Sequence, residues 1–109
     1  DHRIYKKRGN YNPPFYGAAK AALLQLTRYA ACSVGVEGIR VNAIAPGPFP
    51  RPEFLQNFPD LYEALVNKVP MNRLGSPEEL IGPVVFLASN ASSFVNGTTL
   101  SVDGGWTAW

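Results

Sequence analysis

The chain has 109 residues, of which 46% are hydrophobic and 17% are charged, and its formal net charge at pH 7 is +2. This balance is typical of one folded domain or part of one, and the longest apolar stretch is too short to span a bilayer. With no secretory signal at the start either, we expect a cytoplasmic protein without a membrane partner. The single cysteine, Cys32, cannot form an internal disulfide and has no metal-ligand spacing around it. We therefore expect a small core side chain there and no metal site.

The first dozen residues read as a loop. They contain turn formers and charges but no strand pattern, and their basic side chains are Arg3, Lys6, Lys7 and Arg8. No aromatic-interleaved nucleic-acid module accompanies this basic cluster, so it predicts a solvated loop and no nucleic-acid partner. His2 is also expected in solvent. Because the chain starts at Asp1 without a methionine, we expect it to be the middle of a longer protein.

A long helix is expected over about residues 13–33. Asn12 can cap it, and the two prolines that follow suit its first turn, where the amide hydrogens that proline lacks would have no partner. Apolar residues repeat at intervals of three and four along the helix and predict a wide buried stripe, made of Ala19, Ala22, Leu23, Leu26, Tyr29 and Ala30. The stripe could pack only on the chain's own sheet. Alternatively, part of it could face another subunit, since a second helix can approach closely over the small residues Ala18, Ala21 and Ala22.

Tyr16 and Lys20 lie four residues apart near the start of this helix. Residues at that spacing share one helix face, so the phenol and the ammonium group should point the same way. A cation held near a phenol favours its ionised form, which would let Tyr16 exchange a proton with a substrate. The spacing alone is weak evidence, because such a pair also arises by chance.

A strand is expected over residues 39–45, which are rich in β-branched side chains and are followed by Pro46-Gly47-Pro48. A strand after a helix, with little polar alternation, is typical of a parallel sheet covered on both faces. Ligands of such sheets gather at the carboxyl ends of the strands, so Pro46 and Gly47 should meet a ligand. Glycine at that point permits close approach of the backbone.

Residues 48–75 are rich in proline and aromatic side chains and predict a flap over the strand ends, with short helices at about 52–58 and 60–68. Ser76 and Glu79 then form a capping box, and Pro77 suits the first position of a helix that runs to about Ser89. The apolar residues expected to lie in the core from this helix are Leu80, Ile81, Val84, Val85 and Leu87. A turn at Asn96-Gly97 and a last strand over residues 98–102 complete the pattern.

These motifs together resemble the C-terminal half of the short-chain dehydrogenase/reductase family. Any one of them is weak, but five in this order and at these separations are specific. They are the Tyr16-x-x-x-Lys20 helix, the strand and corner at 39–48, the turn at 73–79, the run at 86–89 and the segment at 96–105. The resemblance implies an α/β fold with a doubly wound, Rossmann-like parallel sheet. Residues 1–109 would supply two strands with flanking helices, as the C-terminal portion of one NAD(P)-binding domain whose N-terminal half is absent.

The resemblance also implies a function. The protein would be an oxidoreductase that transfers a hydride between a nicotinamide cofactor, NAD or NADP, and an alcohol or carbonyl of a small molecule, with sugar-like molecules among the candidates. Tyr16 would be its general acid/base, and Lys20 would hold the nicotinamide ribose. Pro46 and Gly47 would border the nicotinamide, and the backbone of Phe49 would meet its carboxamide. The full-length protein would be a homo-oligomer, a dimer or a tetramer.

Three features depart from the family pattern. The glycine-rich loop that receives the pyrophosphate is absent from these residues. The catalytic serine usually lies about a dozen residues before the tyrosine, where this chain has Arg3, so that serine cannot be assigned. Arg51 stands where many members place a threonine that binds the carboxamide. Together with Arg73 or the basic cluster it could instead meet an acidic substrate such as a sugar acid, or both could be ordinary surface arginines.

Two alternatives to a dehydrogenase stay open. The same residues serve sugar epimerases and dehydratases that use bound NAD transiently, although those usually carry a larger C-terminal substrate domain. A truncated half-domain without catalysis could act only as a subunit or a binding module. On either view we expect residues 1–109 alone to be inactive, because a sheet of two strands leaves an edge unpaired and apolar faces uncovered.

Overall fold

A computed structural model describes residues 14–109. The predictions for the basic cluster, His2 and Pro13 lie outside these residues. The described part begins with the long helix α2 (Pro14–Val34) and the short turn η1 (Gly35–Glu37), which lead to strand β1 (Ala43–Pro46). Two short helices follow, α3 (Pro52–Asn57) and α4 (Pro59–Val66). The chain ends with η2 (Pro77–Leu80), α5 (Ile81–Ala88), η3 (Asn90–Ser92) and strand β2 (Thr99–Val102).

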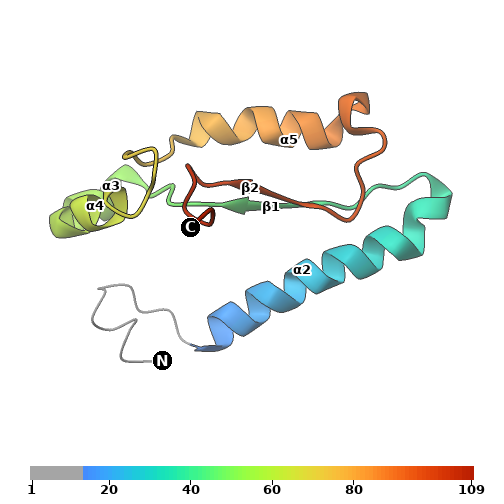
Figure 1. Cartoon of the computed structure of the whole chain (residues 1–109), viewed down its shortest axis with the longest axis horizontal. Coiled ribbons are helices and arrows are strands. Elements are labelled where there is room, and N and C mark those ends of the chain that lie inside the picture. Colours follow the sequence, from blue (N-terminus) through green and yellow to red (C-terminus); the bar gives the residue numbers. More distant parts are fainter. Residues whose placement is uncertain (1–13) are drawn as a thin grey trace.

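The two strands pair in parallel, with Ala43 opposite Thr99 and Pro46 opposite Val102. Helix α5 lies along one face of the pair and α2 along the other, while α3 and α4 lie beyond the carboxyl ends of the strands (Figure 1). This arrangement confirms the predicted α/β class with two parallel strands and flanking helices. It also confirms that a flap with two short helices follows the first strand, each ending one or two residues earlier than expected.

The first strand begins at Ala43, four residues later than the predicted Ile39. Before that point, side-chain hydrogen bonds supplement the backbone pairing. The backbone N–H of Val41 donates to Oδ1 of Asn96 at 2.8 Å, and Gly97 N donates to the Val41 carbonyl at 2.8 Å. The Asn42 carboxamide bridges two further backbone groups, donating to Val95 O at 2.9 Å and accepting from Thr98 N at 3.0 Å.

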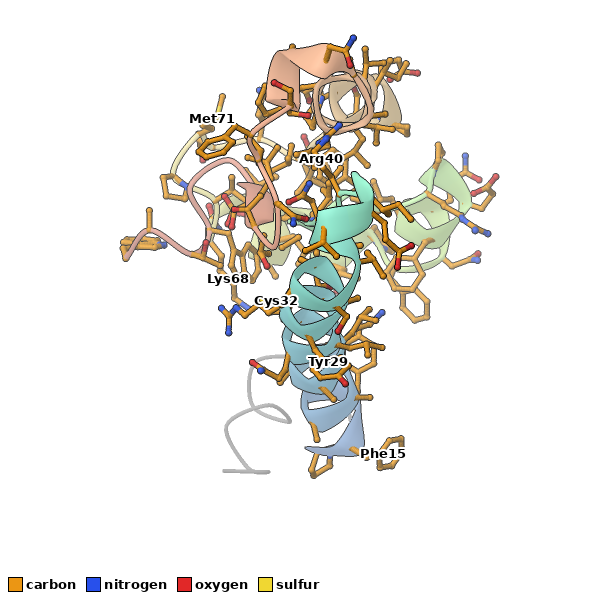
Figure 2. The ribbon with its side chains drawn as sticks, turned by 90° about the vertical axis from the view of Figure 1, so that its right-hand side faces the viewer. Phe15, Tyr29, Cys32, Arg40, Lys68 and Met71 are labelled. Carbon is orange, nitrogen blue, oxygen red and sulfur yellow. The ribbon has the colours of Figure 1, made fainter. Side chains whose placement is uncertain are left out.

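Arg40 links the segment before β1 to the end of α5. Its guanidinium donates to Ser92 Oγ at 2.8 Å and to the carbonyls of Ser89 and Val95 at 3.1 and 3.3 Å. Ser92 is only 1% exposed and donates in turn to the Leu87 carbonyl at 3.0 Å. Figure 2 shows Arg40 extending toward this layer. The arginine that the sequence placed inside a strand therefore acts as a cross-link between two layers.

Helix α2 has nearly the predicted limits, but its apolar stripe is not buried. Only Thr27 and Ala31 are buried on it, whereas the stripe residues Leu23, Leu26 and Tyr29 are more than half exposed. The helix meets the strand layer near its C-terminal end, where Asn96 Nδ2 donates to the Ala31 carbonyl at 3.0 Å, and its N-terminal half diverges from the strands (Figure 1). No described element covers the stripe. Phe15, for example, extends from the end of α2 with no other described element beside it (Figure 2).

Two further burial predictions are wrong, because other described elements do not cover these side chains either. Cys32, expected in the core, is exposed on α2. Ile81, Val84 and Val85 on α5 are more than half exposed, because within residues 14–109 only the two-stranded sheet lies beside that helix. The predicted single helix over 77–89 also divides into η2 and α5. Pro83 lacks the amide hydrogen that would bond to the Glu79 carbonyl in a continuous α-helix, which accounts for the tighter first turn.

Residues 67–75 return across the carboxyl ends of the strands. Val69 is buried there, Met71 N donates to the Gly104 carbonyl at 3.1 Å, and Gly75 N donates to the Pro48 carbonyl at 3.1 Å. Gly104 has a φ of 63°, and a Cβ on it would lie 2.6 Å from Cγ1 of Val69. Glycine is therefore required at this crossing.

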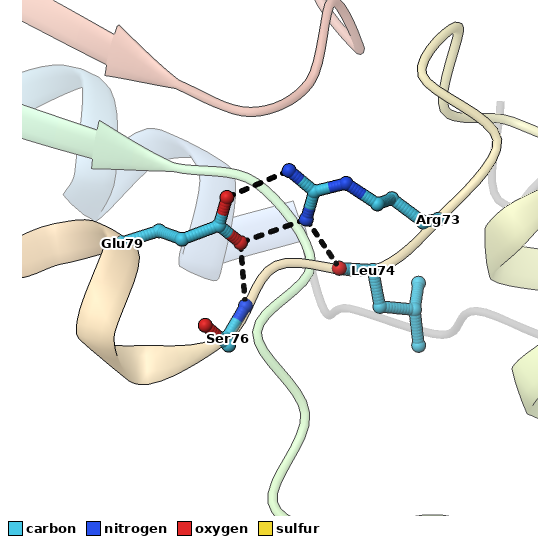
Figure 3. A network of polar contacts seen from close by, with 4 residues as sticks. All are labelled: Arg73, Leu74, Ser76 and Glu79. Atoms are coloured by element: carbon cyan, nitrogen blue, oxygen red, sulfur yellow. Dashed lines mark hydrogen bonds and ion pairs between the residues drawn. The ribbon is translucent and has the colours of Figure 1, made fainter.

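The predicted capping residue Glu79 also carries an ion pair. Its two carboxylate oxygens accept from Nη1 and Nη2 of Arg73 at 2.8 and 2.7 Å, and Oε2 accepts from Ser76 N at 2.9 Å (Figure 3). The hydrogen bonds from Arg73, and then from Ser76, lower the pKa of Glu79 to about 2. This network anchors the start of η2 to the preceding turn.

Glu79→Gln should reduce the stability of the full-length protein at neutral pH and reduce it less as the pH falls. The folded-state pKa of Glu79, about 2, lies below its ordinary value of 4.5, so the carboxylate contributes stability above pH 4.5 and loses that contribution between pH 4.5 and about 2. Melting temperatures of both proteins, compared near pH 7 and near pH 3, measure the effect. Glu78→Gln, which breaks no ion pair among residues 14–109, is the control. A difference between wild type and Glu79→Gln that does not shrink at low pH would contradict the assignment.

Asn42→Ala should lower the free energy of unfolding by about 1–3 kcal/mol, because it leaves Thr98 N without its side-chain partner and removes the shorter of the two side-chain hydrogen bonds to Val95 O. Urea unfolding of the full-length protein measures this change. Asn67→Ala removes an exposed carboxamide that makes no side-chain hydrogen bond among residues 14–109, and it should be nearly neutral. Equal effects of the two substitutions would show that Asn42 does not hold the strands.

Candidate functional site

The two strands leave the sheet side by side at a glycine. Gly47 follows β1 and donates its N–H to the Val102 carbonyl at 2.9 Å. A Cβ on Gly47 would lie 2.6 Å from Cα and 2.8 Å from Cβ of Asp103, so any side chain there would separate the strand exits. The close approach expected at this position is therefore made to the neighbouring strand exit.

Asp103 holds the turn that follows β2. One carboxylate oxygen accepts from Gly105 N at 3.0 Å, and the other accepts from Thr107 N at 3.0 Å and Thr107 Oγ1 at 2.7 Å. These bonds, with that from the Thr107 hydroxyl the strongest, lower the pKa of Asp103 and keep it ionised. The motifs discussed above do not predict this role for Asp103. An aspartate followed by two glycines and a threonine at the fourth position was the available signal.

A cavity of about 640 Å³ lies at the carboxyl ends of the strands. Its walls are mostly apolar, and the charged side chains that line it belong to Arg51 and Asp103. The lining residues are Ala45, Pro46, Gly47, Pro48, Phe49, Pro50, Arg51, Phe54, Leu65, Asp103, Trp106 and Thr107. Pro46, Gly47 and Phe49, all predicted as ligand-binding, thus share one cavity.

Phe49 is fixed by Gly75. A Cβ on Gly75 would overlap the Phe49 ring, so the ring packs directly against the Gly75 backbone. Phe49, Pro48 and Asp103 also line a second cavity of about 340 Å³, where Arg73 and Glu79 lie. The flap is thereby joined to the strand ends by packing at Phe49 and by the hydrogen bond from Gly75 N to Pro48 O.

Tyr16 and Lys20 form a pair on the N-terminal part of α2. The Lys20 Nζ lies 5.6 Å from the centroid of the Tyr16 ring, and the Tyr16 side chain is half-exposed. Helix α2 runs opposite to the strands, so its N-terminal end and the carboxyl ends of the strands lie toward the same end of the molecule (Figure 1). Neither residue lines the cavity. The structure brings Tyr16 to Lys20, and Pro46 to Gly47 and Phe49, but within residues 14–109 it does not join the two sets in one lining.

The two candidate anion-binding arginines differ in their surroundings. Arg73 is held by Glu79 through two hydrogen bonds, so its charge is already neutralised. Arg51 lines the cavity and forms no ion pair within residues 14–109.

The described residues show neither a metal-ligand cluster nor a membrane-spanning helix. In the described range 14–109, no three side chains from His, Cys, Asp and Glu come together as a metal site would require. None of the helices in this range combines the length and the hydropathy needed to cross a membrane.

Comparison with known proteins identifies relatives along nearly the whole chain. A family model described as enoyl-(acyl carrier protein) reductase matches residues 4–107. The cis-4-hydroxycyclohexanecarboxylate dehydrogenase of Sinomonas cyclohexanicum is 45% identical over 100 residues, which are 92% of this chain and 40% of that protein. The 2-dehydro-3-deoxy-D-gluconate 5-dehydrogenase of Dickeya dadantii is 42% identical over 103 residues, 93% of this chain and 41% of that protein.

Solved structures agree with this result. The active-site complex of Pseudomonas aeruginosa RhlG with NADP superposes with a TM-score of 0.78 at 38% identity, over 89% of this chain and 40% of that one. The chain therefore spans about 40% of the length of the relatives it matches. The family match over residues 4–107, together with a shared fold at this level of identity, shows that the chain belongs to the short-chain dehydrogenase/reductase family.

Proposed function

We propose that the protein containing this chain is an NAD(P)-dependent oxidoreductase that interconverts an alcohol and a carbonyl of a small molecule. The observation that carries the proposal is the Tyr16–Lys20 pair on one face of α2, in a chain that belongs to a dehydrogenase family. The relatives from Sinomonas and Dickeya are named as dehydrogenases of a small hydroxy acid and a sugar-like oxo acid. The RhlG complex is named with NADP. These names support a small polar substrate and a nicotinamide cofactor here.

The strand ends would offer one wall to a planar ring. Pro46 and Gly47 both line the cavity of about 640 Å³, whose walls are mostly apolar, and the ring of Pro46 is rigid. Pro46 and Gly47 would flank the nicotinamide, and the backbone of Phe49 would meet its carboxamide. When bound, the nicotinamide supplies or accepts the hydride.

Tyr16 would move the proton of the reaction. In the reducing direction its phenol oxygen gives a proton to the substrate oxygen, and in the oxidising direction it takes the hydroxyl proton. The ammonium group of Lys20 lies over the same ring and would hold the ribose hydroxyls of the cofactor. The flap over 48–75 would exclude water from the cavity.

The proposal includes the organisation of the protein. Residues 1–109 would be the C-terminal portion of one nucleotide-binding domain, in a cytoplasmic homo-oligomer. The extent of the relatives and the uncovered apolar faces of α2 and α5 support this reading. The glycine-rich loop and the catalytic serine would then lie in a preceding part of the same protein.

A half-domain without catalysis, acting as a subunit or binding module, is the second candidate. One observation favours it, namely that neither Tyr16 nor Lys20 lines the cavity formed by residues 14–109. The two candidates differ in the outcome of the following experiments.

Tyr16→Phe in the full-length protein should lower kcat by about 10²-fold or more, because it removes the proton donor, and should leave cofactor affinity nearly unchanged. Steady-state kinetics and cofactor titration measure the two effects. Tyr29→Phe is the matched control, since Tyr29 is exposed on the same helix and also lies outside the cavity. An unchanged kcat in Tyr16→Phe would remove the assigned role and favour the second candidate.

The isolated chain of 109 residues should show no binding of NAD or NADP in a fluorescence titration. The helix N-terminus that receives the pyrophosphate in this family's fold is not among these residues, so most of the binding energy would be missing. The full-length protein provides the positive control. Micromolar affinity of the isolated chain would show that the strand-end cavity binds the cofactor without that loop.

A further inference from the structure

Arg51 is the charged group of the cavity that remains available to a ligand. The other charged side chain in the lining, Asp103, accepts hydrogen bonds from Gly105 and Thr107 in its own turn. Arg51 makes no ion pair with any residue in the range 14–109. A guanidinium at the edge of an apolar cavity presents several N–H donors and no acceptor, so it selects an anionic oxygen group.

The backbone holds Arg51 in place. Prolines stand on both sides of it, and the residue before a proline is restricted to extended conformations. Arg51 has a φ of −69° and a ψ of 143°, in agreement with that restriction. Its carbonyl accepts from Phe54 N at 3.0 Å and from Leu55 N at 3.3 Å, which fixes it at the start of α3. The backbone from which the Arg51 side chain extends is therefore held at the cavity by local structure.

The remaining walls suit a small carbon skeleton. Phe49, Phe54 and Trp106 present aromatic surface, and Leu65 presents aliphatic surface. Arg73 is already bound to Glu79. The Nζ of Lys68 lies over the Trp106 ring, 5.9 Å from its centroid, and adds positive charge near that wall. A guanidinium beside apolar walls matches a molecule with a single anionic group on a compact body.

We infer that Arg51 binds the carboxylate of the substrate, so that the substrate class is a small hydroxy or oxo acid. This inference rests on the proposed function and names the chemistry of the same site. Arg51 acts through binding and takes no part in proton transfer. Anionic oxygen also occurs in the phosphates of the cofactor, and the experiment separates these two sources.

The test measures dissociation constants in the full-length protein saturated with cofactor. The probes are cis-4-hydroxycyclohexanecarboxylate and D-gluconate, each compared with a neutral counterpart, the methyl ester and D-glucitol. Wild type should bind at least one acid about tenfold or more tightly than its neutral counterpart, and Arg51→Met should abolish that preference. Arg51→Lys should restore part of it, because the charge remains while the paired donors are lost.

Arg28→Met is the matched control, since Arg28 is exposed on α2 and does not line the cavity. Circular dichroism shows whether Arg51→Met keeps the fold, as expected for a residue whose structural bonds come from its backbone. Wild type without a preference for either acid would overturn the inference. It would equally be overturned if a separate cofactor titration showed that Arg51→Met weakened cofactor binding while the affinities for the acids were unaffected, which would assign Arg51 to a phosphate.

The result of the Arg51 binding test can be distinguished from the result of the Tyr16→Phe test of the proposed function. Loss of kcat in Tyr16→Phe without any acid preference would support the oxidoreductase and reject the role of Arg51. Acid preference that depends on Arg51, with an unchanged kcat in Tyr16→Phe, would support the anion site and reject the proton donor.

Discussion

The structure depends on the contacts that hold β1 and β2 together at the two ends of their short parallel ladder. Only four residue pairs form the ladder, and a sheet of two strands is marginal by itself. Before the strands, the Asn42 carboxamide bonds to Val95 and Thr98 and fixes the register. After them, Gly47 lets the backbone reach Asp103, at a separation that no side chain would permit. The cavity lies beside this second closure, so the same constraint that aligns the strands also positions its walls.

Local signals predicted most of the elements. Proline at the start of α2 and η2, and the residues around Ser76, indicated where these helices begin. The predicted starts of these helices and of α3 and α4 lie within a residue or two of the observed ones. Pro46-Gly47 after a β-branched run placed the cavity correctly at the carboxyl end of a strand. These features depend on the backbone preferences of a few adjacent residues, and such preferences can be predicted from the sequence alone.

Burial and long-range polar contacts could not be predicted from the sequence in this way. Arg40 bonds to Ser92, 52 residues later, and Asn96 bonds to both Val41 and Ala31, so their roles depend on the packing of distant segments. The stripe on α2 and the apolar residues of α5 have the helical period of a core, but period shows only which residues share a face. Whether that face is covered depends on the elements beside it. Within residues 14–109, Leu23, Leu26 and Tyr29 of α2 and Ile81, Val84 and Val85 of α5 stay more than half exposed.

The two halves of the candidate site differ in the same way: one is fixed by local contacts, and the position of the other depends on long-range packing. Arg51, Gly47 and Phe49 are fixed by prolines, by the strand pairing and by Gly75, all within the strand-end region. Tyr16 and Lys20 are fixed only relative to each other, because α2 is attached near Ala31 and runs about 22 Å further to Tyr16, at about 1.5 Å per residue. Because this part of α2 is long, a small change in the direction of the helix moves Tyr16 by several ångströms. Any surface that packs on the exposed stripe of α2 would therefore control the distance between the Tyr16–Lys20 pair and the cavity, whereas the cavity end of the candidate site is built by this chain's own contacts.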